Sequence, residues 1–376
     1  MKFKFDDIAI NSTKKKIPEE SDKNVYIGLE HIDSECFTIT RWGAEAAPIG
    51  DKLLMQKGDV LFGKRRAYQR KVAIAPFDGI FSAHGMVLRP KENVVTKEFF
   101  PFFISSDQFM ERAVRISVGG LSPTVNWKDL KEQEFELPSI EEQKVLAEKL
   151  WAAYRLKESY KKLLAATDEM VKSRFIEMFG NPLAIEQKYP LRKLGECCVL
   201  NPKRSDLTIS DDMKVSFIPM QSVDETGRLC NVSDAFYGDV KKGFTYFAEK
   251  DVLFAKITPC MENGKGAIAY NLTNGIGFGS TEFHVLRPIN NVSNPTWLLA
   301  LTRMPIFREY AAKNMSGTGG QKRVGSQFLQ NFMVGLPPIE AQNEFERIYN
   351  QADKSGFELR KSIESIDAVI KSLINN

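Results

Sequence analysis

The chain has 376 residues, of which 43% are hydrophobic and 27% charged, and its formal net charge is +4. This length predicts two or three domains that each bury a core, and the mild charge does not by itself indicate a nucleic-acid-binding protein. No apolar run is long enough to cross a bilayer. Without a secretory leader, the five cysteines are expected to be reduced thiols in the cytoplasm.

In chain order, the pattern predicts a globular unit, a helix, a second globular unit and a second helix. The first unit, 1–136, has β-type runs at 57–63, 72–75 and 86–89 and helical segments at 99–103 and 108–113. Helical periodicity follows over 137–179. A second unit is expected over 180–335 and a second helix over 336–376.

The chain repeats itself at a spacing of about 199 residues. A Leu-Pro-x-Ile-Glu-x-Gln motif at 137–143 recurs at 336–342 and opens each predicted helix. An Asp-Val-Leu-Phe marker at 59–62 recurs at 251–254, and Val-Leu-Arg-Pro at 87–90 recurs at 285–288. A period this long indicates a duplicated domain with its spacer, and not a solenoid unit. The two copies differ most before the marker, over 24–56 and 215–247.

The two predicted helices carry apolar residues at steps of three and four, which place one apolar stripe along each helix. We expect these stripes to pair as an antiparallel coiled coil, which gives an α+β fold of two globular units in a pseudo-twofold repeat, separated by two long helices. The alternative is that each helix packs on its own globular unit. Gly356 is a point where the second helix could kink or break. The stripe residues are Leu146, Leu150, Leu163, Leu164, Phe345, Ile348, Leu359, Ile363, Ile366 and Ile370.

Motifs for catalysis are missing from the sequence. The Asn263-Gly264-Lys265-Gly266 run lacks the spacing of a phosphate-binding loop. His31, His84 and His284 are too scattered for a zinc site, and the last two are expected to be structural. Acid-x-Lys triplets at 129–131 and 212–214 have no convincing second acid. We therefore expect no catalytic residue and no metal site.

A basic run at 64–71 follows the first marker and is expected to contact DNA phosphates, which supply most non-specific affinity. The alternative is a solvated charged face. A glycine-rich run at 316–323, with a less basic counterpart at 117–124, is the second candidate, because glycines let backbone N–H groups approach an anion; a tight connection needing positive φ would explain it equally well. The candidate DNA-binding residues are Lys64, Arg65, Arg66, Tyr68, Arg70, Lys71, Lys256, Lys265, Gly319, Gly320, Lys322 and Arg323.

Taken together, the sequence resembles the specificity (S) subunits of type I restriction–modification systems. The resemblance rests on the twin helix openings, the Asp-Val-Leu-Phe marker, the Gly-Thr-Gly-Gly-Gln-Lys-Arg-Val run at 317–324 and the segment 174–180. It spans essentially the whole chain. The chain departs from the pattern at 119–124, where the Gly-Gln-Lys-Arg sequence is missing from the first copy.

The resemblance implies two target-recognition domains that each read half of a split double-stranded DNA site, and two paired helices that act as a ruler. It implies a non-catalytic subunit that binds no cofactor itself. S-adenosylmethionine would belong to modification (methyltransferase) subunits, and ATP and Mg to restriction (translocase–nuclease) subunits. Base readout is expected in the divergent stretches. A stand-alone DNA-binding remnant, a nuclease with an unrecognised site and a coiled-coil scaffold are the competing hypotheses.

Overall fold

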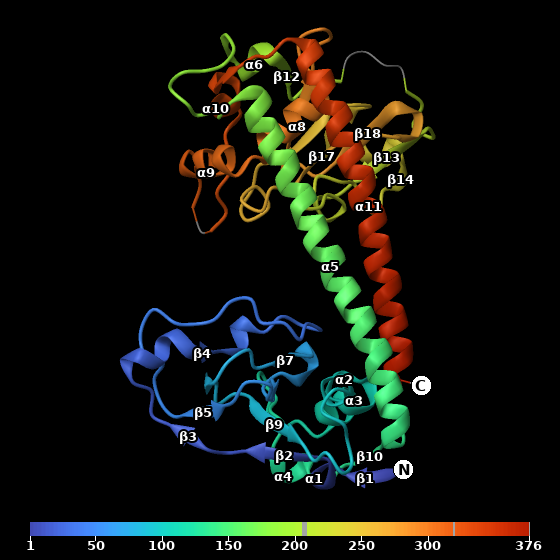
Figure 1. Cartoon of the computed structure of the whole chain (residues 1–376). Coiled ribbons are helices and arrows are strands. Elements are labelled where there is room, and N and C mark those ends of the chain that lie inside the picture. Colours follow the sequence, from blue (N-terminus) through green and yellow to red (C-terminus); the bar gives the residue numbers. More distant parts are fainter. Residues whose placement is uncertain (205–208, 319, 376) are drawn as a thin grey trace. The chain divides into compact units, whose positions relative to one another are not determined.

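The computed structural model describes residues 1–204, 209–318 and 320–375. The chain divides into two compact units, one made of residues 1–161 with 361–376 and the other of 162–360. Each unit contains a globular part and a stretch of both long helices (Figure 1). Among the described residues, no helix is both long enough and apolar enough to span a membrane.

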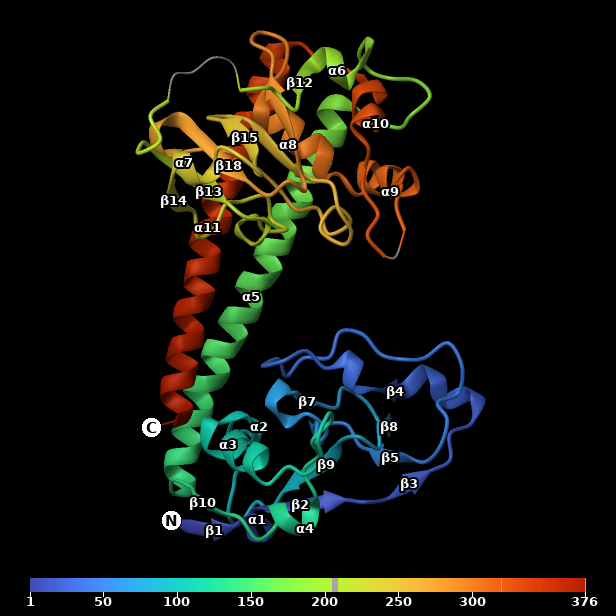
Figure 2. The same ribbon diagram turned by 180° about the vertical axis from the view of Figure 1, so that it is seen from behind.

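The two long helices are α5 (Ile140–Phe179) and α11 (Ile339–Asn375). Within each unit they run side by side in opposite directions, as both views show (Figures 1 and 2). In unit 1, Lys157 of α5, whose side chain is 8% exposed, forms an ion pair with Asp367 of α11. In unit 2, the rings of Phe175 and Phe345 lie 5.5 Å apart at 82°. The predicted antiparallel pairing is therefore confirmed.

Each helix also packs on the globular part that precedes it in the chain, so the alternative packing occurs as well. Leu150 and Phe345 are fully buried in these cores, and Leu146 and Ile370 pack against the core of unit 1. The predicted stripe residues Leu164, Ile348, Leu359, Ile363 and Ile366 are partly buried.

Leu163 does not belong to the stripe. Its side chain is 53% exposed, whereas the adjacent Leu164 lies against Gly356 of α11. A step of three and a step of four both fit a helical stripe, so periodicity alone admits both leucines, but only one of two adjacent residues can face the partner helix.

Gly356 does not break α11, which is continuous across it. A Cβ at this position would lie 3.4 Å from Cδ1 of Leu164 and 3.2 Å from Nη2 of Arg360. The glycine therefore allows close packing of the two helices and leaves room for the Arg360 side chain.

One four-stranded sheet has the same strand order in both units. In unit 1 the order is β2 (Ala9–Ser12), β9 (Met86–Pro90), β6 (Val60–Phe62), β7 (Val72–Ile74). In unit 2 it is β12 (Cys198–Leu200), β19 (Phe283–Pro288), β16 (Val252–Ala255), β17 (Gly266–Ile268). The Asp-Val-Leu-Phe marker thus forms an inner strand, paired with the Val-Leu-Arg-Pro strand.

Both faces of the inner strands β6 and β16 are buried, which explains why the marker is a continuous apolar run. Side chains alternate between the faces of a strand: Val60 and Phe62 join the core next to the helices, whereas Leu61 joins a second core. In unit 2, Val252 and Phe254 likewise join the core next to the helices, whereas Leu253 joins a second core.

The other four-stranded sheet differs between the units. Its order is β3 (Lys15–Lys16), β5 (Lys52–Met55), β8 (Gly79–Phe81), β4 (Tyr26–Ile27) in unit 1. In unit 2 it is β14 (Ser233–Phe236), β13 (Lys214–Ile218), β18 (Ile276–Gly279), β15 (Thr245–Ala248). In each, a middle strand has one parallel and one antiparallel neighbour. The fourth strand is added beside the antiparallel neighbour in unit 1 and beside the parallel one in unit 2.

Short helices and two-stranded ribbons complete each unit. In unit 1 these are β1 (Lys2–Lys4), α1 (Phe5–Ile8), α2 (Phe100–Ser105), α3 (Asp107–Arg115), α4 (Trp127–Leu130) and β10 (Glu134–Glu136), with 3-10 helices Glu20–Val25, Leu29–His31 and Ala67–Gln69. In unit 2 these are β11 (Leu191–Lys193), α6 (Leu194–Cys197), α7 (Tyr237–Val240), α8 (Pro295–Arg303), α9 (Pro305–Lys313), α10 (Ser326–Asn331) and β20 (Met333–Gly335), with 3-10 helices Met220–Ser222 and Thr273–Gly275.

The repeated glutamine of the helix-opening motif joins each helix to the loop that follows the Val-Leu-Arg-Pro strand. Gln143 and Gln342 are both fully buried. The side-chain amide of Gln342 donates to the carbonyls of Val292 (2.9 Å) and Pro337 (2.8 Å), and its Oε1 accepts the N–H of Asn294 (2.8 Å). Gln143 makes the three equivalent hydrogen bonds in unit 1. Buried amides without partners are costly, so the motif specifies this joint.

Candidate nucleic-acid interface

The structure brings the two candidate loops of unit 1 together. The basic run begins where β6 ends, and the segment 117–124 connects α3 to α4. The N–H of Arg66 donates to the carbonyl of Pro123 (2.7 Å), and the N–H of Val125 donates to the carbonyl of Lys64 (2.9 Å). These backbone hydrogen bonds make one surface of two runs that are far apart in sequence.

Unit 2 repeats the arrangement at equivalent positions. The N–H of Thr258 donates to the carbonyl of Lys322 (3.0 Å), and that of Val324 to the carbonyl of Lys256 (2.9 Å). The Thr258 hydroxyl also donates to the carbonyl of Gly320 (2.7 Å). Gly320 has a φ of 78°, as the tight-connection alternative requires. Gly319 lies outside the described residues.

Four side chains of the basic run, those of Lys64, Arg65, Arg66 and Tyr68, are exposed or partly exposed. Arg66 and Tyr68 are exposed, and the Arg66 guanidinium rests on the Ser122 hydroxyl at 3.1 Å. The Arg65 guanidinium lies 3.4 Å from the ring of His84. Burial lowers the pKa of Lys64, and the charge of Lys15 adds to the shift. Within the described residues, Lys64, Arg65 and Arg66 form no ion pair, so no carboxylate neutralises their charge.

Arg70 and Lys71 have partners inside unit 1. The Arg70 guanidinium forms ion pairs with Glu35 (3.2 Å) and Asp107 (2.9 Å) and donates to the carbonyl of Ser105 (2.7 Å). The Lys71 ammonium donates to the carbonyl of Leu29 at 2.6 Å. The run itself contains no acid, but the fold supplies two carboxylates from elsewhere, so Arg70 stabilises the unit instead of presenting free charge.

In unit 2 the cations divide in the same way. The Arg323 guanidinium binds the Glu282 carboxylate at 2.8 Å, and this pairing holds the pKa of Glu282 below its ordinary value. Lys322 is exposed, whereas Lys256 and Lys265 are partly buried, and no ion pair of these three lysines is found among the described residues. They are the cations of this loop pair that remain available.

The two histidines next to the Val-Leu-Arg-Pro strands differ. His284 is buried between Asn201 and the carbonyl of Val324, so its predicted structural role is confirmed. His84 is exposed beside the basic run, and the pKa of its ring is lowered by partial burial and then by Arg65, Lys64 and Lys52. Sequence reasoning missed that His84 lies beside the basic run, because its ring reaches Arg65 only when the chain folds.

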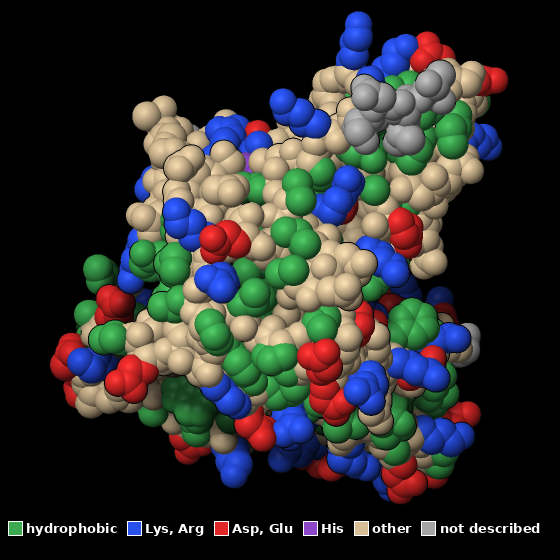
Figure 3. All heavy atoms as spheres, turned by 90° about the horizontal axis from the view of Figure 1, so that it is seen from above, with side chains coloured by type: hydrophobic (Ala, Val, Ile, Leu, Met, Phe, Trp, Pro, Cys, Tyr) green, Lys and Arg blue, Asp and Glu red, His purple; other side chains and the backbone are tan. Residues whose placement is uncertain are grey.

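Charge over the molecular surface does not by itself mark the interface. Lysine and arginine side chains are interspersed with acidic ones on the face shown in Figure 3. Among the described residues, no group of three or more His, Cys, Asp or Glu side chains could hold a metal ion. The paired loops are therefore distinguished by their unpaired cations and by their repetition in both units.

Comparisons with known proteins agree with this architecture. The family model described as the type I restriction modification DNA specificity domain matches residues 1–166 and again 187–366. The chain is 34% identical over 202 residues to the type I restriction enzyme EcoAI specificity subunit of Escherichia coli, across 51% of this chain and 33% of that protein. It is 36% identical over 165 residues to the EcoEI specificity subunit of the same organism, across 43% of this chain and 27% of that protein. The alignments thus span about a third or less of these relatives.

Solved structures show the same fold. A chain from a study of complex assembly and conformational transition of the type I R-M system aligns over 100% of this chain and 96% of its own length, with a TM-score of 0.54 and 18% identity. The type I restriction–modification S subunit of M. genitalium aligns over 100% and 94%, with a TM-score of 0.54 and 13% identity. Because the family model matches both halves of the duplicated sequence, the chain belongs to the type I restriction modification DNA specificity family.

Proposed function

We propose that the chain is the specificity subunit of a type I restriction–modification complex and recognises a bipartite double-stranded DNA site. The observation that carries the proposal is that the family match occurs twice, and each matched half contains the same pair of joined loops with unpaired cations. Two copies of a DNA-recognition domain fit a DNA site made of two half-sites. Phosphate contacts from these loops would position each unit on the duplex, and base contacts would come from the divergent stretches.

The domain organisation follows from this role. Target-recognition domains would occupy 1–136 and 180–335, and the spacer helices 137–179 and 336–376 would separate them. Paired helices have a fixed length per residue, so they would determine the spacer between half-sites. The base-reading residues would lie within the divergent stretches 24–56 and 215–247. The fourth strand of the second sheet, β3, precedes the first stretch, whereas its counterpart β14 lies within the second.

Chemistry would reside in the partners. The chain would direct modification subunits, which use S-adenosylmethionine, and restriction subunits, which use ATP and Mg, to the DNA without binding these cofactors itself. The relatives are named as specificity subunits of restriction enzymes, which supports a non-catalytic role in a larger complex. A cytoplasmic location follows from that role, because the partners and the DNA are found there.

Co-expression with its modification subunits tests the proposal. We expect methylation at one bipartite sequence when the chain is present, and none when it is omitted, as read by methylation-sensitive sequencing of plasmid DNA. The purified chain alone should neither cut nor methylate DNA. Methylation at the same sites without the chain, or cleavage by the chain alone that is lost in Asp129→Ala or Asp212→Ala, would contradict the proposal.

A further inference from the structure

Two residues at equivalent positions of the duplicated helices contact the divergent segments. Counting eleven residues on from Gln143 reaches Tyr154, and eleven on from Gln342 reaches Asp353. Eleven residues make about three helical turns, so each lies on the same face as its buried glutamine. Equivalent places in the two helices therefore face the globular part of their own unit.

Tyr154 binds the backbone of the segment 36–38 in unit 1. Its hydroxyl oxygen accepts the N–H of Phe37 at 2.9 Å and that of Thr38 at 3.2 Å, and it lies 3.2 Å from the Thr38 hydroxyl. The side chain is only 6% exposed, and burial raises the pKa of its hydroxyl. A buried acceptor for two backbone donors fixes the conformation of that segment.

Phe37 fastens the same segment by packing. Its ring lies 5.0 Å from that of Phe102 on α2, and 5.9 Å and 5.1 Å from those of Trp151 and Tyr154 on α5. Ser34 and Glu35, which precede this segment, contact the basic run. The Ser34 hydroxyl donates to the carbonyl of Gln69 at 2.6 Å, and the Glu35 carboxylate forms an ion pair with Arg70. The contact made by Tyr154 is thus connected to the candidate DNA-binding loop.

Asp353 has the corresponding contact in unit 2, made with different chemistry. Its Oδ1 accepts Nε–H of Arg228 at 2.8 Å, and its backbone carbonyl accepts Nη2–H of the same guanidinium at 2.6 Å. The segment carrying Arg228 forms a turn that the Asp224 carboxylate stabilises, because it accepts the backbone N–H groups of Thr226 (2.8 Å) and Arg228 (2.9 Å).

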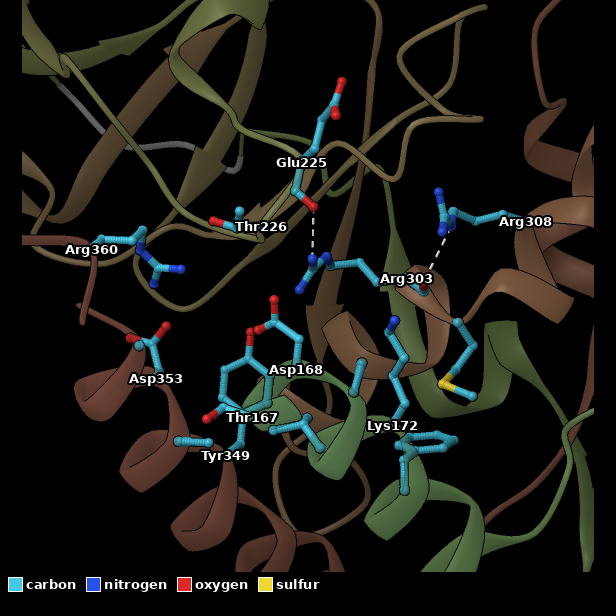
Figure 4. A pocket seen from close by; sticks show the side chains of 16 residues that line it. Thr167, Asp168, Lys172, Glu225, Thr226, Arg303, Arg308, Tyr349, Asp353 and Arg360 are labelled. Carbon is cyan, nitrogen blue, oxygen red and sulfur yellow. Dashed lines mark hydrogen bonds between the residues drawn. The ribbon is translucent and has the colours of Figure 1, made fainter. Parts of the chain in front are cut away.

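A cavity lies beside each contact. In unit 2 it measures about 250 Å³ and is lined by Glu225 and Thr226 of the segment and by Asp353 of α11 (Figure 4). Arg303 of α8 points toward the segment and donates to the Glu225 carbonyl at 2.7 Å. In unit 1 a cavity of about 270 Å³ is lined by Glu35, Phe37 and Tyr154, among others. Each divergent segment therefore rests on a few specific contacts beside an open space.

We propose that Tyr154 and Asp353 are positioning residues for DNA recognition, each holding the divergent segment of its own unit on the helix and thereby the geometry in which one half-site is read. This inference rests on the proposed function. It assigns a specific role to two helix residues outside the sheet marker and the basic loops. Because each contact lies within one unit, its loss acts on one half-site and leaves the other unchanged.

The test is selection of randomised duplex DNA by the full chain in complex with its modification subunits, followed by sequencing. Tyr154→Phe removes only the hydroxyl, and Tyr160→Phe is its matched control, since no hydrogen bond of the Tyr160 hydroxyl is found among the described residues. Asp353→Ala is matched by Glu358→Ala, an exposed acid on the same helix. Melting temperatures of all four variants show whether they fold.

We expect Tyr154→Phe to relax the preference at one half-site by about fivefold or more, and Asp353→Ala to relax the other, with both controls like the wild type. Arg228→Ala should reproduce Asp353→Ala, and the double variant should be no worse than either single one. Folded variants that keep both preferences, or relax both half-sites equally, overturn the inference. A wild-type chain that selects no bipartite sequence overturns the proposed function instead.

Discussion

Asp251, immediately before β16, binds Arg287 on the neighbouring strand β19 through two hydrogen bonds, which the guanidinium donates from Nε at 2.8 Å and from Nη2 at 2.7 Å. Asp59 and Arg89 make the same bidentate pair in unit 1, at 2.6 and 2.9 Å. The first residue of one repeated motif thus binds the arginine of the other. Asp251 is 1% exposed and also accepts the N–H of Ala248. The two motifs recur together because they form one ion pair at the start of the inner strand.

Loss of this pair should destabilise unit 2. Arg287→Ala leaves a buried carboxylate without its cation, and because the arginine is 31% exposed we expect a loss of about 2–3 kcal/mol, toward the lower end for buried pairs. Scanning calorimetry measures it. Arg347→Ala, which removes a 76% exposed arginine from a surface pair, is the control and should cost about 0.5 kcal/mol or less. Equal melting of the two variants would show that the pair is dispensable.

The basic loops should give DNA binding its salt dependence. Arg65→Ala with Arg66→Ala should weaken binding to all sequences about equally and reduce the slope of log K against log salt by up to about one unit for each phosphate interaction removed. Arg70→Ala, which removes one positive charge from the same run, should instead lower the melting temperature of unit 1, because its guanidinium is held by Glu35 and Asp107. Titrations at several salt concentrations distinguish these outcomes. If the Arg65 and Arg66 variants left the slope unchanged, the run would be a solvated face.

Unit 2 should lose stability under mildly acid conditions. Burial chiefly holds the pKa of His284 below its ordinary value of 6.5, so below that pH the unfolded chain takes up a proton that the folded one does not. Stability is therefore lost as pH falls from 6.5 toward the lowered value, at up to about 1.4 kcal/mol per pH unit. Glu282 does not interfere, because its lowered pKa places its effect below 4.5.

Melting between about pH 7.5 and 5.5 measures this effect. His284→Gln should be less stable throughout but less sensitive to pH than the wild type. His84 shifts in the same direction and is unchanged in the variant, so it cancels in the comparison. The same pH dependence in both proteins would exclude His284 as its source.

The helix pair should determine the distance between half-sites. Seven residues inserted after Lys161 in α5, with seven after Arg360 in α11, keep the apolar stripes in register and add ~10 Å of helix. We expect the preferred DNA spacer to lengthen by up to about three base pairs, with both half-sites unchanged. The readout is methylation of a spacer library. Four-residue insertions, which rotate the stripes, should impair folding; an unchanged spacer in a folded seven-residue variant would contradict the ruler hypothesis.

Repetition made the fold predictable. The inner strand, the helix starts and the antiparallel pairing all follow from motifs that occur twice and from helical periodicity. Details that depend on distant partners do not follow. Periodicity could not separate Leu163 from Leu164, and composition could not show that Gly356 permits close packing instead of a kink. Arg70 looked like a free cation because the carboxylates of Glu35 and Asp107 come from other segments, and the same folding brings His84 to Arg65.

The opposite placement of the fourth strand has an evolutionary consequence. In the second sheet, β3 lies at one edge of the three shared strands and β14 lies at the opposite edge. Either edge can therefore accept an additional strand, while the repeated ion pair and the buried glutamine stay unchanged. After duplication, the two copies could diverge by adding strands at different edges of this sheet, without compensating substitutions in the core residues that both copies share. Novel half-site preferences would then arise through peripheral insertions, and this lineage should vary there faster than in its inner strands.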